Sequence, residues 1–363
     1  MRRFACLLSV LPIVLLGAIL GQNTPTLEVQ RPATAQPSRT DRQITLEVQV
    51  TDKSGAPMRG LQKEDFTLLD DKQPQKILSF QAVDSGAGMA ADPPVEIILV
   101  VDAVNTSFMS NSYERDAVRN FLLQNGGKLP WPVSFIFVSE GGPQILNRSS
   151  RDGNALVGFY DQYDSGLKNK YLTRSGGRWG ASERIQISLN ALNTIVAYEK
   201  TRPGRKLMLW FSRGWPMLAE GANVHLTTKE AQRLYESIAA VSTGLREAHI
   251  TVYSIDVGGL ANAGTIRDSY YESFLKGVTS PSRAEPGDLG LQVLAVQSGG
   301  RVFKSSNDLG PAIRQCAADA DAFYLVSFDG ARADQANEYH SLGIMVNKPG
   351  ATVRTRTGYY AQP

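Results

Sequence analysis

The chain has 363 residues, of which 42% are hydrophobic and 20% charged, with a formal net charge of +3. At roughly 150 residues per domain, this composition predicts two folded domains and excludes a largely disordered chain. The small net charge gives no basic surface for nucleic acid, so no nucleic-acid partner is expected.

The first 42 residues have the composition of a targeting segment and a leader. Arg2 and Arg3 precede an apolar run over residues 4–20, which is the pattern of a secretory signal. We expect a signal peptide at residues 1–21 and an exported protein that is periplasmic, associated with the cell envelope or secreted. Residues 22–42, rich in Gln, Thr, Pro and Arg, predict a flexible leader. An uncleaved anchor is the alternative, although the run is short for a span of ~20 apolar residues.

The chain contains two cysteines, Cys6 and Cys316. Cys6 lies too early to be a lipobox cysteine, so no lipid anchor is expected. Loss of the signal would leave Cys316 alone, which excludes an intramolecular disulfide and a zinc site built from cysteines. Small residues around Cys316 predict a helix in which this side chain is buried.

Residues 43–85 predict the first part of a β domain. Residues 44–50 alternate apolar and polar side chains, and residues 66–69 and 77–83 repeat this strand pattern between turn residues. A linker rich in Gly, Ala, Asp and Pro follows at residues 85–94.

A second domain is expected over residues 95–320. Residues 95–102, VEIILVVD, form an almost continuous apolar run, which is typical of a central strand covered on both faces of a parallel sheet. Strand and helix patterns then alternate, which predicts an α/β fold with a doubly wound, mostly parallel sheet of the Rossmann type. Two long interruptions, residues 147–181 and 258–288, are expected to be functional or mobile loops. Helices are expected at residues 113–124, 182–199, 229–247, 289–297 and 309–320, and strands at 133–138, 206–212, 250–256 and 301–304.

Strand patterns return in the C-terminal segment, residues 321–361, at residues 323–328, 340–346 and 352–359. The early β segment alone has too few strands to bury a face. We therefore expect the two ends of the chain to pair into one small, sandwich-like β domain.

Ligands of open α/β sheets bind beyond the carboxyl ends of the strands, so polar residues at these ends are candidate site residues. Asp102 and Asp256 could instead stabilise the turns that follow their strands. The candidate ligand-edge residues are Asp102, Asn105, Thr106, Ser107, Ser212, Arg213 and Asp256.

The strand ending in Asp102, with the DAVNT that begins there, resembles the start of a von Willebrand factor A-like domain, whose D-x-S-x-S loop builds a metal-ion-dependent adhesion site. Further pieces are VTDKSG at 50–55, EDF at 64–66, QKI at 75–77 and RTGYY at 356–360. With them the chain resembles, over residues 43–361, the exported bacterial VWFA-related family named for acidobacteria. This resemblance implies export and binding but no established substrate.

The metal chemistry of that loop is incomplete in this sequence. Asp102 and Thr106 match ligand positions that would hold Mg²⁺ or Mn²⁺, but Val104 replaces the first serine. Arg213 stands where the resemblance places a second carboxylate. A cation at this position opposes a divalent metal ion, because two unit charges 4 Å apart interact by ~4 kcal/mol at an effective dielectric constant of 20 and the sign here is repulsive. We therefore expect no cofactor. Our hypothesis is that Arg213 takes the place of the metal and pairs with Asp102, with Asp256 as a second candidate partner.

Sequence signals of catalysis are missing, so an enzyme is not expected. His225, His249 and His340 are widely separated and are expected at the surface or at loop edges, which argues against a zinc enzyme. No nucleophile elbow or phosphate-binding loop is present. A serine hydrolase is the alternative and would need a histidine within hydrogen-bond reach of Ser212 or Ser107.

The sequence thus predicts an exported, non-catalytic module that binds a protein partner or mediates adhesion through a degenerate metal-ion-dependent site. The competing interpretation is a structural or assembly component of the cell envelope, in which this site is vestigial and another face binds.

Overall fold

The computed structural model describes residues 42–84, 95–106, 111–146, 148–167, 178–216, 226–262 and 269–363. The predicted signal peptide, the predicted leader up to residue 41, the predicted linker at residues 85–94 and Ser107 lie outside these ranges. No helix of the described ranges has the length and apolar character needed to cross a membrane.

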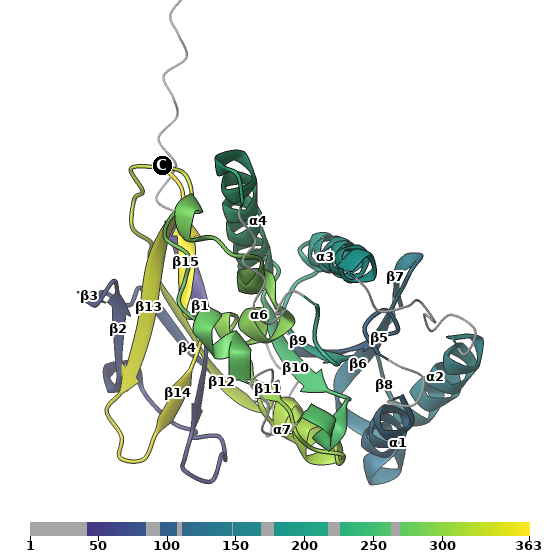
Figure 1. The fold of residues 1–363 in the computed structure, drawn as a ribbon. Helices are drawn as coiled ribbons and strands as arrows, with labels where there is room; N and C mark the ends of the chain where they lie inside the picture. The colour runs from purple at the N-terminus through teal and green to yellow at the C-terminus, as the bar shows by residue number, and fades with distance from the viewer. Residues whose placement is uncertain are drawn as a thin grey trace, which may run out of the picture. The chain divides into compact units, whose positions relative to one another are not determined.

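The α/β part of the chain is built on a mostly parallel sheet (Figure 1). Its strands are β5 (Val95–Asp102), β6 (Lys128–Ser139), β7 (Gly142–Ile145), β8 (Ser150–Asp152), β9 (Arg205–Ser212), β10 (Ile250–Asp256) and β11 (Val302–Phe303). Their order is β11-β10-β9-β5-β6-β7, with β8 paired to β6, and only β7 and β8 run antiparallel. Apart from β8, this is the 3-2-1-4-5-6 order of doubly wound folds, whose topological switch point lies here between β5 and β9.

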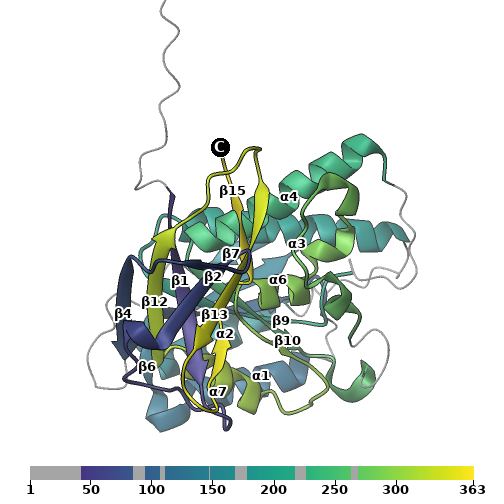
Figure 2. The ribbon, with the colours of Figure 1, turned by 90° about the vertical axis from the view of Figure 1, so that its left-hand side faces the viewer.

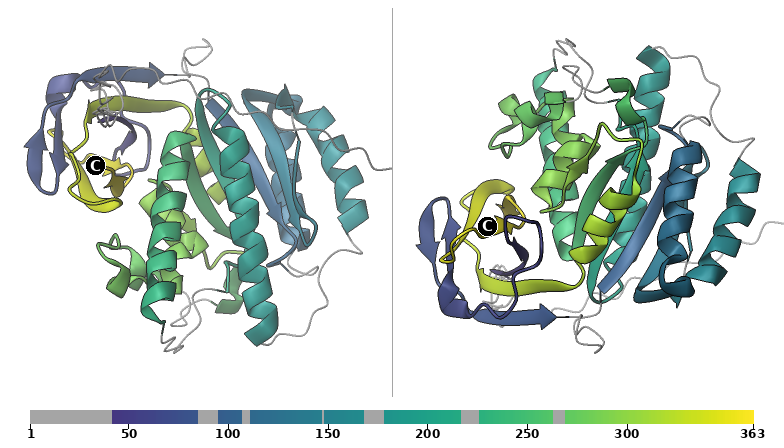
Figure 3. Two further views of the ribbon diagram at one scale, coloured as in Figure 1. Left: turned by 90° about the horizontal axis from the view of Figure 1, so that it is seen from above. Right: turned by 90° about the horizontal axis from the view of Figure 1, so that it is seen from below.

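Helices cover both faces of this sheet, as the two views of Figure 3 show. They are α1 (Asn111–Leu122), α2 (Gly153–Leu167), α3 (Arg178–Glu199), α4 (Thr228–Glu247), α6 (Leu291–Gln297) and α7 (Gly310–Ala318). Leu99 and Val101 of β5 share a core with α1, α2 and α7, whereas Ile98 and Val100 share one with α3, α4 and α6. Because both faces are buried, the strand is apolar at successive positions.

Two antiparallel sheets contain strands from both ends of the chain, in the orders β14-β1-β12-β4 and β15-β13-β2-β3. Figure 2 shows the purple N-terminal strands among the yellow C-terminal ones. We call these strands the β module: β1 (Gln43–Thr51), β2 (Phe66–Asp70), β3 (Gln73–Gln75), β4 (Ser79–Asp84), β12 (Ala322–Asp329), β13 (Glu338–Val346), β14 (Thr352–Arg354) and β15 (Gly358–Ala361).

Strand pairing and a shared core hold the β module together. Gln43 of β1 pairs with Asp329 of β12, and Asp70 of β2 pairs with Leu342 of β13. Apolar side chains of both sheets, including the fully buried Leu46, form one cluster. The α/β part begins after β4 and ends before β12, and these two strands are neighbours in the first sheet.

Some elements differ from those predicted. The interruption expected at residues 147–181 contains β8 and α2, and residues 352–359, expected as one strand, contain β14 and the start of β15. At the start of α2, a Cβ on Gly153 would lie 1.9 Å from the carbonyl oxygen of Leu122, so glycine serves a close approach there. The interruption expected at residues 258–288 contains 3₁₀ turns. These and the other 3₁₀ turns are η2 (Lys63–Asp65), η4 (Gln124–Gly127), η5 (Gly259–Asn262), η6 (Tyr270–Phe274), η7 (Pro281–Arg283) and η8 (Pro286–Leu289).

Candidate functional site

Asp102 ends β5 beside the topological switch point, and its side chain is buried with the residue only 1% exposed. Its Oδ1 accepts hydrogen bonds from the backbone N–H groups of Val104 (2.9 Å) and Asn105 (3.0 Å). Its Oδ2 accepts from Asn105 Nδ2 and from Trp210 Nε1, both at 2.9 Å. A carboxylate has about four lone-pair sites, so these four donors use its accepting capacity.

The environment of Asp102 is that of a turn-stabilising carboxylate. Burial raises its pKa, and the hydrogen bonds from Asn105, Trp210 and Val104 oppose this rise only in part. The two backbone bonds fix the turn after β5, and the indole of Trp210 ties that turn to β9. The side chain therefore organises the loop that leaves the strand.

The rest of this loop packs inward. Val104 and Thr106 are 4% and 7% exposed, and no group of the described residues gives Thr106 Oγ1 a hydrogen bond. Asn105 Nδ2 also donates to Ser188 Oγ on α3 (2.9 Å), a contact that the sequence did not suggest. Asp102 and Thr106, the two predicted metal ligands, therefore lie in a packed loop anchored to α3 and β9.

The predicted pairing of Arg213 with Asp102 is wrong. Among the ion pairs of the described residues, none joins Arg213 to Asp102. Arg213 lies beyond the end of β9 with an exposed side chain, whereas Asp102 is buried beneath the loop and already bonded to N–H donors. The predicted pair rested on opposite charges alone, and these do not show that Arg213 is exposed while Asp102 is buried.

Asp256, at the end of β10, belongs to a different part of the edge. It lines a pocket of about 390 Å³ with Lys304 and Asp308, a pocket that does not include Asp102. Asp256 Oδ1 accepts from the backbone N–H of Gly258 (2.7 Å). A Cβ on Gly258 would stand 2.9 Å from Asp256 Oδ1 and 2.8 Å from Arg213 Nε, so glycine leaves room for both side chains. The predicted edge residues thus do not form one compact site.

Ser212 is fully buried, and its Oγ accepts a hydrogen bond from the N–H of Gly214 (3.1 Å). The two described histidines contact carboxylates elsewhere: His249 Nδ1 lies 2.7 Å from Glu47 Oε1, and His340 Nδ1 lies 2.9 Å from Asp71 Oδ2. His225 and Ser107 lie outside the described residues. No described histidine therefore serves Ser212 as a general base.

Three large side chains remain exposed around the carboxyl edge. Tyr113, near the start of α1, is 53% exposed, and Leu260, in η5 after β10, is 59% exposed. Arg213 is exposed between them in the sheet order, after β9. We call Tyr113, Arg213 and Leu260 the edge triplet. Trp215, by contrast, is 3% exposed and packs against Trp210 with ring centroids 5.1 Å apart, so it pins the loop.

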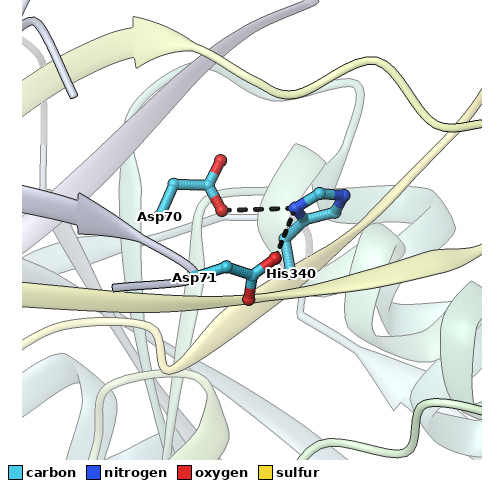
Figure 4. A group of neighbouring side chains, drawn as sticks. All are labelled: Asp70, Asp71 and His340. Atoms are coloured by element: carbon cyan, nitrogen blue, oxygen red, sulfur yellow. Dashed lines mark ion pairs between the residues drawn. The ribbon is translucent and has the colours of Figure 1, made fainter. Parts of the chain in front are cut away.

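A cluster that sequence reasoning missed lies in the β module (Figure 4). His340, expected at the surface or a loop edge, is only 9% exposed and faces Asp70 and Asp71. These residues are about 270 positions apart in the chain, and only the register of β2 with β13 brings them together. The available signals were a histidine within a strand pattern and an Asp-Asp pair at a turn. They could not be connected without the register of β2 with β13.

Neither a protein-family model nor a curated protein matches this chain. Solved structures to which it is similar include the human COPII-coat protein Sec24c (9% identity, TM-score 0.34), covering 74% of this chain and 43% of that one. The PilB minor pilin from Streptococcus sanguinis, solved as a mutant, gives 10% identity and a TM-score of 0.35, covering 62% and 61%. The SpRpn10 VWA domain gives 16% identity and a TM-score of 0.22, covering 54% and 92%. The chain thus spans less than two thirds of the first two structures. These likenesses are weak and carry no information on function.

Proposed function

We propose that this protein is an exported, non-catalytic module that binds a protein partner through the carboxyl edge of its parallel sheet. The observation that carries the proposal is the edge triplet: Tyr113, Arg213 and Leu260 are exposed on the segments that follow three neighbouring strands of the sheet, β5, β9 and β10. Tyrosine and arginine are enriched in protein interfaces and among the residues that dominate binding energy. Doubly wound sheets also bind ligands at this edge.

We further propose that this binding does not need a metal ion. The four N–H groups around Asp102 would have to be displaced before its carboxylate could ligate Mg²⁺, which strongly favours oxygen ligands in near-octahedral geometry. Val104 supplies no side-chain oxygen, and Arg213 adds positive charge beyond the same edge. The loop after β5 is therefore held by its own hydrogen bonds without an ion.

Export and membership of the VWFA-related family belong to the same proposal. They rest on Arg2, Arg3 and the apolar run at residues 4–20, and on the sequence resemblance over residues 43–361. The absence of catalysis is supported by the burial of Ser212.

The test is capture of partners from envelope extracts by the immobilised protein, with and without EDTA. Leu260→Asp and Arg213→Glu should each weaken capture of the same partner by at least about tenfold, because each removes an interface side chain. Met345→Asp is the matched control, since Met345 is 55% exposed on β13, outside the parallel sheet. Wild-type capture should persist in EDTA.

Two outcomes would overturn the proposal. Loss of capture with Met345→Asp but not with Leu260→Asp would favour an assembly component that binds through the β module. Loss of capture in EDTA, restored by Mg²⁺ and abolished by Asp102→Asn, would show that the adhesion-type metal site is functional.

A further inference from the structure

Three potential ligand atoms converge in the β module, away from the parallel sheet. Asp70 ends β2, Asp71 is the first residue of the turn to β3, and His340 lies on β13. Their ligand atoms lie within 4.8 Å of one another. His340 Nδ1 is 3.3 Å from Asp70 Oδ1 and 2.9 Å from Asp71 Oδ2, and Figure 4 shows both contacts as dashed lines.

Each carboxylate is held by its outer oxygen and turns its inner oxygen toward the histidine. Asp70 Oδ2 accepts a hydrogen bond from the hydroxyl of Tyr359 (2.7 Å). Asp71 Oδ1 accepts from the N–H (2.8 Å) and the Oγ (2.9 Å) of Ser341. Outer-shell bonds of this kind orient carboxylates that bind metal ions.

The inner oxygen of Asp70 points to a missing ligand. Asp70 is 4% exposed, and no described residue gives its buried Oδ1 a hydrogen bond. A buried carboxylate oxygen without a donor is costly, and a cation would satisfy it. The ring of His340 is held beside it by stacking on Tyr359, with centroids 5.1 Å and planes 16° apart.

We propose that Asp70, Asp71 and His340 bind one divalent metal ion of the zinc class, with water completing its coordination. Two ligands that are each about 2.0–2.2 Å from a metal ion lie about 3–3.5 Å apart in tetrahedral or octahedral geometry, close to the 2.9 and 3.3 Å separations here. Imidazole nitrogen with carboxylate oxygen suits Zn²⁺ and its neighbours. Two carboxylates and a neutral imidazole balance the charge of a divalent ion.

The site is open on one side and joins distant parts of the chain. Asp71 is exposed, which gives an ion a path from solvent, whereas Asp70 and His340 are buried. The ion would tie the β2–β3 turn to β13, two segments far apart in sequence. Metal links that close long loops restrict the unfolded chain, so the ion would act as a structural clip.

The same geometry would also suit a protonated His340 between two aspartates with no metal, so the test must separate these states. The full chain, freed of metal with a chelator, is titrated with Zn²⁺ in a calorimeter and with Co²⁺ in a spectrophotometer. The wild type should bind one equivalent, give a Co²⁺ spectrum of nitrogen and oxygen ligation, and unfold at a higher temperature with Zn²⁺ than without.

Asp71→Asn is the decisive variant. Asp71 has a φ of +47°, which asparagine tolerates, and the amide oxygen can still accept from Ser341. Binding should weaken by at least about tenfold, because an anionic ligand is lost. Asp52→Asn is the matched control, since Asp52 is an exposed turn residue whose Oδ1 accepts from the N–H and Oγ of Ser54. It should bind as the wild type does.

His340→Gln should abolish the Co²⁺ spectrum, and if this variant does not fold, Asp71→Asn decides alone. No saturable binding to the wild type, or equal binding to Asp71→Asn, would overturn the proposal. In the capture assay above, Asp71→Asn also separates the two sites, because partner binding through the edge triplet should persist in this variant.

Discussion

Replacing Asp102 by asparagine tests whether this side chain organises the loop. The amide oxygen of Asn can replace Oδ1 and accept from the N–H groups of Val104 and Asn105. Its NH₂ group, however, would face the indole N–H of Trp210, which is fully buried. A buried donor left without an acceptor costs about 1–3 kcal/mol, so we expect Asp102→Asn to lower the free energy of unfolding by this amount.

Asp102→Ala should cost more, about 2–4 kcal/mol, because the two backbone donors lose their acceptor as well. Part of this loss is offset, since burial that raises the pKa of Asp102 also penalises its charge. The assay is urea unfolding followed by far-UV circular dichroism. Addition of Mg²⁺ should not restore stability to either variant.

A double-mutant cycle isolates the bond between Asp102 and Trp210. Trp210→Phe removes the indole donor, so Asp102→Asn should cost about 1–2 kcal/mol less in that background than in the wild type. The reasoning is refuted if the two substitutions are additive, or if Asp102→Asn changes the free energy of unfolding by less than about 0.5 kcal/mol.

Three further predictions concern stability in urea. Burial raises the pKa of Asp288 to about 6, so folding loses stability as pH rises from about 4 to 6. Asp288→Asn should therefore add up to ~3 kcal/mol to the free energy of unfolding at pH 7.5 and less than about 1 kcal/mol at pH 4; equal effects at the two pH values would contradict this. Lys206, 1% exposed, donates to the carbonyls of Glu199, Arg202 and Ala248; Lys206→Met should cost about 2–4 kcal/mol, and a neutral result would contradict it. A Cβ on Gly300 would lie 1.8 Å from a carbonyl oxygen of β10, so Gly300→Ala should lower the free energy of unfolding by at least about 2 kcal/mol. Gly60→Ala is the control: its Cβ would meet no atom within 4 Å, so this substitution tests only the strain of a positive φ.

The strands of the parallel sheet were predictable where burial on both faces leaves an uninterrupted apolar run. The bounds of β5 match the predicted residues 95–102, and β9 and β10 match to within one residue. Helix α2 was missed because Gly153 and Gly158 break its pattern, although Leu156, Val157 and Tyr160 form a buried helical face. Local sequence does not show that a glycine serves a close contact rather than a turn.

Only those residues of the candidate site that stand at the ends of strands were predictable from the sequence. Asp102 stands at the edge where it was expected, but its partner Trp210 became visible only with the register of β5 against β9, which pairs Val100 with Trp210. The same limit hid His340 and its two aspartates. Sequence order gives the type of residue at an edge, whereas burial depth and register decide which partner it meets.

The neighbouring positions of β4 and β12 make the α/β part an insertion with closely spaced ends. Asp84 and Ala322 are directly opposite each other in the antiparallel pair, as the two residues flanking a hairpin turn would be. A two-residue turn could therefore bridge them and replace residues 85–321. The doubly wound sheet is thus inserted between two paired strands of the β module. It could be removed, exchanged or moved to another protein without changing the path of any strand in the β module.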